Sequence, residues 1–360
     1  MSPPFKNRFC LRILPVCLFV LSLFCLAPAG PAFAVPFIDK ETEISMGQKA
    51  DVQVVAQYGL YQDKELQLYV NELGQKLVGN LSNPEFSRYF FKVVDSAEIN
   101  AFALPGGYIY VTRGILAMIN SEAELAGVLG HEIGHVTQHH GAKQVIRSIG
   151  AQILSIGGAI ASPKNAGEWL MVSTQLFNTI NLGYGREAEL ESDAHGLMIA
   201  QKSGYHPKAM VDFLSNLRQQ EILTGQVYHS FQATHPETKE RIIKAGTLSQ
   251  SIYNRNKGTL KDNREGYLKK IQGMEYGGSS HKGDRRDYDK EYIDIYKVKP
   301  GDTFQSIAVK ELEDEKKDWD IAILNGRRMD SKPVPGEYLK LVRKGVPASR
   351  KILELKPEKF

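Results

Sequence analysis

Cysteine is nearly absent from this sequence. The chain has 360 residues and three cysteines, and Cys10, Cys17 and Cys25 all lie in its first 34 residues. The remaining chain therefore has no disulfide framework and no thiolate with which to hold a metal. It must fold around a hydrophobic core, and any zinc site in it must use histidine and carboxylate ligands.

Long apolar runs are equally scarce, and the one clear run occupies Ile13–Leu26. Three basic residues precede this run, and the small-x-small sequence Ala32-Phe33-Ala34 follows it. This arrangement predicts a secretory signal peptide over residues 1–34 that is cleaved after Ala34, with an uncleaved membrane anchor as the alternative.

An excess of positive charge is also lacking once the signal peptide is set aside. The full chain has a formal net charge of +4. Because Lys6, Arg8 and Arg12 are the only charged residues in the signal peptide, the rest of the chain has a net charge of +1. So balanced a chain has no electrostatic surface for nucleic acid, and no nucleic-acid partner is expected.

What the sequence does contain is the pattern H-E-x-x-H, formed by His131, Glu132 and His135. On a helix, positions i and i+4 share a face, so two imidazoles can bind one Zn²⁺ while Glu132 reaches a water beside it. The surrounding stretch Leu125–His140 is apolar and rich in glycine. This composition favours a buried helix over a polar helix with two solvated histidines.

A second stretch, Gly183–Gly196, carries alternating acidic residues at Glu187, Glu189 and Glu191, followed by Asp193. Glu189 and Asp193 are four residues apart and share a helical face, so a carboxylate from this helix can complete a site of two histidines and one glutamate. The same alternation fits a solvated acidic face. Spacing alone leaves the choice open.

Hydrophobic periodicity predicts further helices and a small sheet. Helices are expected over 36–59, with Ile44, Met46, Val52, Val54 and Val55 in the core, and over 64–78, with Leu66, Val70, Leu73 and Leu77 in the core. Ser121 and Glu124 predict a capping box at the start of the zinc helix. Strands are expected over 86–94 and 108–111, the second after a turn at 105–107. That second strand either offers an edge to an extended substrate or belongs to a core hairpin.

Residues 145–161 are apolar but contain three glycines. They are too short and too rich in glycine for a membrane span, so we expect a flap or loop near the site, with a membrane-touching segment as the alternative. A helix is expected over 168–180.

Together these motifs resemble one family. The stretch HEIGHVTQHH, the later pattern R-E-x-E-x-x-x-D-A-x-G and the stretch NAFALPGGYIYVTRG are similar to the zinc metallopeptidases of family M48, which include HtpX, the CAAX prenyl proteases and the BepA-type proteins. The resemblance covers most of residues 40–275. It implies an α+β, mainly helical zincin-type domain with a small sheet over residues 35–276.

The resemblance also implies the roles of the site residues. His131, His135 and Glu189 would bind one Zn²⁺ per chain, Glu132 would be the general base, and Asp193 would be a proton donor or would stabilise the transition state. Arg186 matches a family arginine. His139 departs from the family, where arginine is common. It lies one helical turn past His135, so it either supports the metal ligands from behind or is a surface residue, and the surface position is the simpler interpretation.

His235 lies in the sequence Thr234-His235-Pro236, which is similar to a stretch in soluble members of the family. One interpretation is structural: the segment opens a helix packed near the site. The other makes His235 a fourth zinc ligand that displaces water and keeps the enzyme latent. Tyr205-His206-Pro207, by contrast, is expected to be only a turn before a helix.

The C-terminal part resembles a small glycan-binding module. Residues 277–291 form a polar linker, and residues 292–345 carry V-x-P-G-D-T-x-x-x-I-A, L-N-G and P-G-x-x-L-x-L, which are similar to a LysM domain. This predicts a strand, two helices and a strand, and implies peptidoglycan as a partner. Residues 346–360 form a basic tail.

Two functional hypotheses follow. The first is a periplasmic zinc endopeptidase, associated with the outer membrane or cell wall, that hydrolyses misfolded or stalled envelope proteins. Its partners would be unfolded or extended proteins, with peptidoglycan and a peripheral membrane contact as further options. The second is a chaperone or wall-associated scaffold whose zinc site is mostly closed. The intact Glu132 favours the first, because a scaffold has no use for a general base.

Overall fold

The computed structural model describes residues 39–156, 183–224, 231–236, 239–255, 258–278, 290–328 and 330–347. The expected signal peptide, the expected helix over 168–180 and almost all of the tail lie outside these residues. Among the described residues, no helix combines the length and the hydropathy needed to cross a membrane.

Two helices near the start of this part begin at aspartate caps. Asp39 caps α2 (Lys40–Tyr58) and Asp63 caps α3 (Lys64–Val78), each accepting a hydrogen bond from the backbone three residues on. The bounds and all four core positions of α3 are as expected from the sequence.

The buried face of α2 differs from the expected one. Met46 and Val54 are buried, but Ile44 is 38% exposed and Val52 is 67% exposed. The inward side is completed instead by the small residues Gly47 and Ala50 and by Glu43. The inward side of α2 therefore combines apolar side chains with small ones, which let the helix pack closely on its neighbours.

The first sheet has the strand order β1-β3-β2, in which β1 (Phe90–Val94) is parallel and β2 (Ala101–Leu104) antiparallel to β3 (Tyr108–Thr112). The interpretation of residues 108–111 as a substrate edge is wrong, because β3 is paired on both sides. The expected hairpin is present and fully buried, and the edge strand of this sheet beside the zinc helix is β2.

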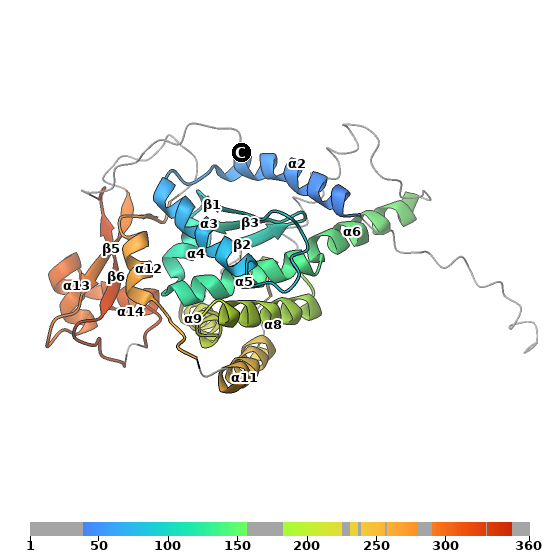
Figure 1. The fold of residues 1–360 in the computed structure, drawn as a ribbon. Coiled ribbons are helices and arrows are strands. Elements are labelled where there is room, and N and C mark those ends of the chain that lie inside the picture. The colour runs from blue at the N-terminus through green and yellow to red at the C-terminus, as the bar shows by residue number, and fades with distance from the viewer. Residues whose placement is uncertain are drawn as a thin grey trace, which may run out of the picture. The chain divides into compact units, whose positions relative to one another are not determined.

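Alternation along β2 separates two layers of core. Ala101 and Ala103 join the core that includes α3 and α5 (Glu122–Thr137), while Phe102 and Leu104 pack with α2 on the opposite face. Figure 1 shows this arrangement, with α2 along one side of the sheet and α5 along the other. The edge strand is thereby held beside the helix that carries H-E-x-x-H.

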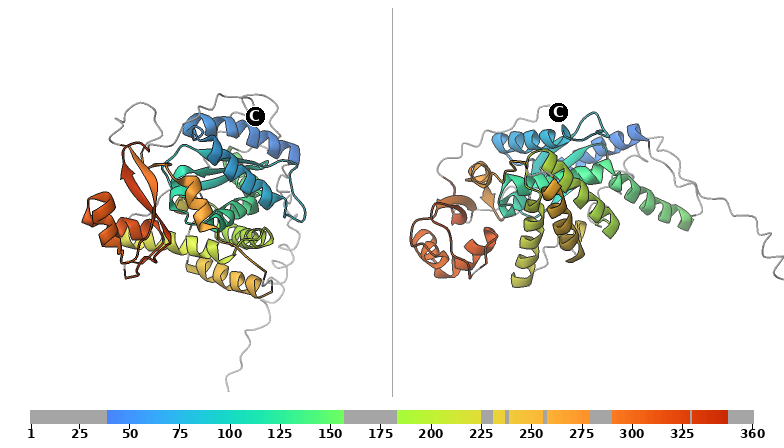
Figure 2. Two further views of the ribbon diagram at one scale, coloured as in Figure 1. Left: turned by 60° about the vertical axis from the view of Figure 1, so that its left-hand side comes forward. Right: turned by 60° about the horizontal axis from the view of Figure 1, so that its bottom comes forward.

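Helix α5 lies against α8 (Arg186–Lys202), and the two helices run side by side in Figure 2. Glycines lie at their closest approach. A Cβ added at Gly196 would lie 2.8 Å from the backbone nitrogen of His131, and one added at Gly130 would lie 3.0 Å from the Cα of Gly196. The glycines that lower helix propensity here allow the two helices to approach. The approach brings the ligand-bearing faces of both helices together.

The start of α5 confirms half of the expected capping box. Ser121 Oγ accepts a hydrogen bond from the backbone of Glu124, as predicted. The Glu124 carboxylate, however, accepts from the backbone N–H of Asn120 and not from that of Ser121. Both side chains of the motif therefore bond backbone N–H groups at the helix start. The Glu124 carboxylate, however, bonds the N–H one residue before the one that the motif implies.

The expectation of a loop over 145–161 is wrong for the part that the structure describes. Helix α6 (His140–Ile156) continues through residue 156, and Val145 is buried in the core beside α2. Residues 157–161 lie outside the described residues. The amphipathic pattern of these residues, which is typical of a helix, therefore predicts their structure better than their glycine content, which suggested a loop.

The structure describes further helices and strands after the first sheet and in the C-terminal part. They are α4 (Arg113–Met118), α9 (Lys208–Thr224), α10 (Phe231–Thr234), α11 (Lys239–Arg255), α12 (Arg264–Ile271), β4 (Glu275–Tyr276), β5 (Glu291–Lys297), α13 (Phe304–Leu312), η2 (Glu315–Lys317), α14 (Asp318–Leu324) and β6 (Tyr338–Lys344). Strands β4, β5 and β6 form a second, antiparallel sheet in that order. The predicted order of strand, helices and strand is present from β5 to β6.

This C-terminal part has a hydrophobic cluster of its own and also packs against the rest of the chain. Ile293 and Leu324 belong to the same hydrophobic cluster as α3 and α5. The buried Lys340 donates from Nζ to the carbonyl oxygens of Ala117, Met118 and Ile119, at the end of α4, at 2.6 to 3.1 Å. A cation at the C-terminal end of a helix is favourable, so this contact fixes β6 just ahead of α5.

Candidate metal centre

Four buried side chains converge between α5, α8 and the end of α10. His131 and His135 come from α5, Glu189 from α8, and His235 follows α10 directly. Each side chain is at most 1% exposed. Nε2 of His131 lies 3.0 Å from Nε2 of His135 and 3.3 Å from Nδ1 of His235. Oε1 of Glu189 lies 3.4 Å from Nε2 of His135 and 3.2 Å from Nδ1 of His235.

These separations match a tetrahedral zinc site. Four ligands at zinc–nitrogen and zinc–oxygen distances of about 2 Å are separated from one another by about 3.3 Å. Burial holds the pKa of His135 well below its ordinary value, so this imidazole presents a lone pair. His131, His135, Glu189 and His235 are therefore a donor set that fits one Zn²⁺.

Glu132 lies beside this group without taking part in it. The side chain is fully buried, and neither carboxylate oxygen accepts a hydrogen bond from any residue that the structure describes. Its Oε1 lies 3.4 Å from Nε2 of His235. Burial raises the pKa of Glu132, which makes it a stronger proton acceptor than an exposed glutamate.

A buried arginine outside the zinc-binding motifs binds both carboxylates of α8. Arg241, from α11, donates from Nε and Nη2 to the two oxygens of Asp193 at 2.8 and 2.7 Å, and its Nη1 lies 2.6 Å from Glu189. Although burial alone would raise them, Arg241 lowers the pKa of Asp193 to about 2, and His235 and Arg241 hold that of Glu189 well below its ordinary value. Both acids are therefore charged.

Asp193 lies behind His131 and not in front of the cluster. Its Oδ1 is 2.9 Å from Nδ1 of His131, the ring nitrogen that faces away from the other ligands. Such a carboxylate fixes the ring orientation and the tautomer of a metal-binding histidine. The placement favours a positioning role for Asp193, and its role as proton donor or transition-state stabiliser stays a prediction.

Among the alternating glutamates, Glu189 alone enters the cluster. Glu187 is exposed, and Glu191 reaches His140, whose Nε2 lies 3.3 Å from it. Arg186, which matches the family pattern, is exposed and pairs with Glu240. Helix α8 therefore carries both a solvated acidic face and one candidate metal ligand. Its contact with α5 fixes the rotation of α8 about its own axis, and this rotation decides which glutamate points inward.

Two ring side chains, His140 and Tyr184, pack around His135 and extend the site. Nδ1 of His140 lies 3.0 Å from Nδ1 of His135, and the ring of Tyr184 stacks on His135 with centroids 4.0 Å apart. Tyr184 carried no signal in the sequence, since it precedes the acidic helix in a glycine-rich turn. His139 is not a free surface residue, because its Nδ1 bonds Glu43 at 2.7 Å.

The fold and this site define a class, the metallopeptidases that bind zinc through H-E-x-x-H and a later glutamate. The model of peptidase family M48 matches residues 64–248, just over half of the chain. The chain belongs to peptidase family M48, as the motifs indicated, and members of this family are zinc-dependent metallopeptidases.

Characterised relatives agree with this assignment. The chain is 32% identical to the beta-barrel assembly-enhancing protease of Escherichia coli over 213 residues, which cover 56% of this chain and 43% of the relative. It is 31% identical to the mitochondrial metalloendopeptidase OMA1 of Arabidopsis thaliana over 168 residues, or 44% of this chain and 32% of the relative. The match therefore spans less than half the length of either relative.

Proposed function

We propose that this protein is a zinc endopeptidase that cleaves unfolded or misfolded proteins of the bacterial envelope. The observation that carries the proposal is Glu132, a buried carboxylate without a hydrogen-bond partner among the described residues, beside a group fit to hold zinc. The names of the relatives, a beta-barrel assembly-enhancing protease among them, support the substrate class. The signal peptide predicted over residues 1–34 supports a periplasmic location.

The chemistry is divided among the residues of the site. When bound, zinc supplies a Lewis acid that polarises the scissile carbonyl and acidifies a water. Glu132 accepts the proton of the attacking water and passes it to the leaving amine. Asp193 and Arg241 hold His131 and Glu189 in place, and the edge of β2 offers backbone groups to an extended substrate.

A chelator experiment tests the enzymatic proposal. The purified protein is expected to cleave casein, to lose this activity when dialysed against a chelator, and to regain it when one equivalent of zinc is added back. Cleavage that is insensitive to the chelator would contradict the assignment of the site. Persistent inactivity with zinc bound would favour the second hypothesis, a chaperone or scaffold with a closed site.

The position of His235 supports the proposal that the enzyme is latent at rest. Its Nδ1 occupies the corner of the cluster that a catalytic zinc site keeps open for water, and its Nε2 lies 3.1 Å from the carbonyl oxygen of Ala101 on β2. In this position His235 covers both the fourth metal position and part of the substrate edge.

Replacing His235 by alanine is therefore expected to raise the casein-cleaving activity by about tenfold or more, because a population that is mostly closed becomes open. Activity per bound zinc is the measurement. His206→Ala is the matched control, because His206 stacks on Tyr253 and caps the turn before α9, away from the cluster. Equal activity in the wild type and His235→Ala would show that His235 does not block the site.

The C-terminal part supports a further element of the proposal, a LysM-like module that binds peptidoglycan and keeps the enzyme near the outer membrane or cell wall. Its order of β5, two helices and β6 is the one expected for such a module. The full-length protein is expected to sediment with purified peptidoglycan, and Trp319→Ala, at an exposed aromatic of α14, to weaken the effect. Ile243→Ala, at an exposed position of α11, is the control. A protein that stays in the supernatant would refute glycan binding.

A further inference from the structure

A histidine that follows the H-E-x-x-H pattern, His140, packs against the candidate ligand His135. Its side chain is only 7% exposed, and its Nδ1 lies 3.0 Å from Nδ1 of His135. The two rings meet edge to face, with centroids 5.0 Å apart. The contact is therefore made through the ring nitrogen of His135 that does not face the other ligands.

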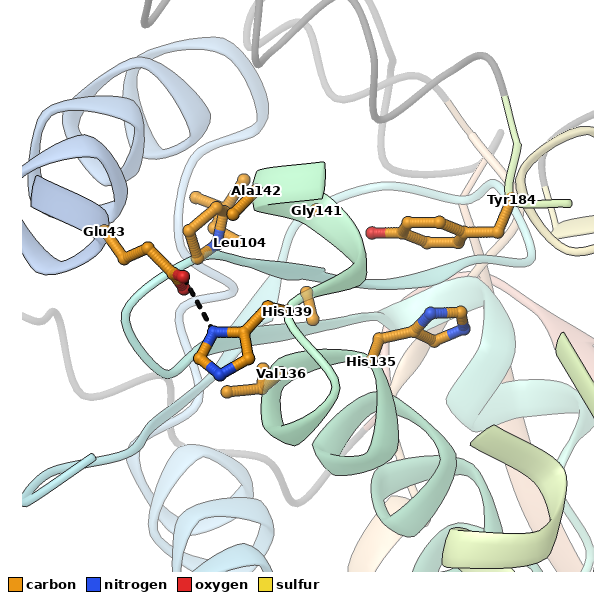
Figure 3. A pocket seen from close by; sticks show the side chains of 10 residues that line it. Glu43, Leu104, His135, Val136, His139, Gly141, Ala142 and Tyr184 are labelled. Carbon is orange, nitrogen blue, oxygen red and sulfur yellow. Dashed lines mark hydrogen bonds and ion pairs between the residues drawn. The ribbon is translucent and has the colours of Figure 1, made fainter. Parts of the chain in front are cut away.

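A sharp turn between α5 and α6 places His140 against the site. Only two residues separate the two helices, and the second of them, His139, adopts the left-handed conformation with a φ of 55°. This conformation is uncommon for a residue with a side chain. It is held here by the bond between His139 and Glu43 of α2 (Figure 3). Glu43 is fixed in turn, because α2 packs so closely on the turn after β2 that a Cβ added at Gly106 would lie 2.7 Å from the Cα of Ile44.

The hydrogen bonds assign a tautomer to each of the two rings. Nε2 of His135 lies 3.0 Å from Nε2 of His131, inside the donor set, so it must offer a lone pair to a metal. A neutral His135 then carries its proton on Nδ1 and donates it to Nδ1 of His140. His140 in turn carries its proton on Nε2, which lies 3.3 Å from the carboxylate of Glu191. The hydroxyl of Ser192, 3.3 Å from Nδ1 of His140, can donate to the same nitrogen.

The two metal-binding histidines are thus supported in different ways. His131 contacts a carboxylate directly, since Oδ1 of Asp193 lies 2.9 Å from its Nδ1. His135 instead contacts a neutral ring, and the carboxylate behind that ring belongs to Glu191, whose side chain is 48% exposed. A carboxylate at the surface keeps most of its hydration, so the chain through His140 avoids burying another charge next to the ligands.

We propose that His140 is a positioning residue of the metal centre, which fixes the tautomer and the orientation of His135 and is itself oriented by Glu191. The inference rests on the zinc site of the proposed function and not on its substrate. His140 is not one of the converging ligands and acts through His135. The inference also gives a role to Glu191, which otherwise belongs to the solvated face of α8.

Zinc titration against a competing chelating dye tests this role. His140→Phe keeps an aromatic ring but removes the acceptor, so zinc affinity is expected to fall by about 10- to 100-fold. His140→Asn places an amide oxygen where Nδ1 was, so it should restore most of the affinity. Unchanged affinity in His140→Phe, or equal losses in both variants, would overturn the proposal.

A cobalt spectrum separates positioning from a merely structural role. With Co²⁺ in place of zinc, His140→Phe is expected to shift the visible absorption bands, which report the geometry of the ligands, whereas His140→Asn should keep them. Denaturant unfolding of the metal-free proteins is the control for stability. If His140→Phe is less stable without metal but keeps the cobalt bands of the wild type, the residue only fills space and the proposal is wrong.

The exposed position of Glu191 allows a test that does not disturb the core. Glu191→Ala should weaken zinc binding by about two- to fivefold in the wild type, the range of an exposed charged contact. It should have no effect in a His140→Phe background, because Glu191 acts through that ring. Glu187→Ala, at an exposed position of the same helix, is the matched control and should change neither affinity. Equal effects of Glu191→Ala in the two backgrounds, or none in either, would refute the chain from Glu191 to His135.

These measurements use no substrate, so they separate the inference from the peptidase. If His140→Phe weakens zinc binding but the wild type with zinc cleaves no casein, the peptidase is refuted and the role of His140 remains. A wild type that binds no zinc would refute both.

Discussion

Replacing Glu132 by glutamine is expected to leave zinc bound and to slow casein cleavage by about 10²- to 10⁴-fold, the usual contribution of a general base. Glutamine has the same size and fits the same buried space, but it cannot accept and pass on a proton at neutral pH. The measurement is the initial rate of casein cleavage, normalised to the zinc content of each preparation.

The control for this variant is Glu187→Gln, because Glu187 is exposed on α8 and points away from the cluster. It should keep both zinc and activity. A Glu132→Gln protein that cleaves casein at the wild-type rate would remove Glu132 from the mechanism. A variant that loses its zinc would instead show that Glu132 acts as a ligand.

Replacing Arg241 by alanine is expected to have the largest effect on stability. The change leaves the buried carboxylate of Asp193 without its bidentate partner and removes the contact of Glu189 at 2.6 Å. Breaking a buried ion pair on one side costs about 3–5 kcal/mol of the free energy of unfolding. Loss of the group that orients the ligands should also lower zinc affinity by about 10- to 100-fold.

Denaturant unfolding of the zinc-free protein and a competitive zinc titration measure the two effects separately. Arg241→Lys keeps the charge but loses the bidentate geometry, so an intermediate result is expected. Arg255→Ala, at an exposed position of the same helix, should change neither quantity. If Arg241→Ala unfolds and binds zinc as the wild type does, the arginine does not organise the site.

Local sequence patterns predicted the elements whose apolar residues follow one regular spacing. Helix α3 has the bounds and the core residues expected from its apolar spacing, and its aspartate cap marks its start. On α2 the same spacing correctly predicted Met46 and Val54 as buried but was wrong for Ile44 and Val52, which are exposed. The inward face of α2 is set by the turn around Gly106, which lies nearly sixty residues further along the chain and is invisible in a local window.

The C-terminal part shows the same limit at the level of domains. Its motifs predicted the order of strand, helices and strand, and a polar linker predicted a separate unit. The structure adds contacts between this part and the rest of the chain, because Glu275 and Tyr276 pair with β5 and Lys340 is buried against the end of α4. Such packing depends on complementary surfaces, which composition does not reveal. A polar segment predicts a linker whether or not the residues at its two ends pack against each other. The division into separate domains stays a prediction.

The sequence by itself determined the H-E-x-x-H helix, the roles proposed for His131, Glu132 and His135, and the family. This was sufficient because residues four apart on a helix share a face whatever surrounds them. The resemblance to the family also singled out Glu189, a choice that spacing alone had left open. The tertiary structure alone decided that Arg241 binds the acids of α8 and that Glu43 lies beside His139. Each of these contacts joins segments far apart in the chain, and only the packing of helices through their glycines brings them within bonding distance.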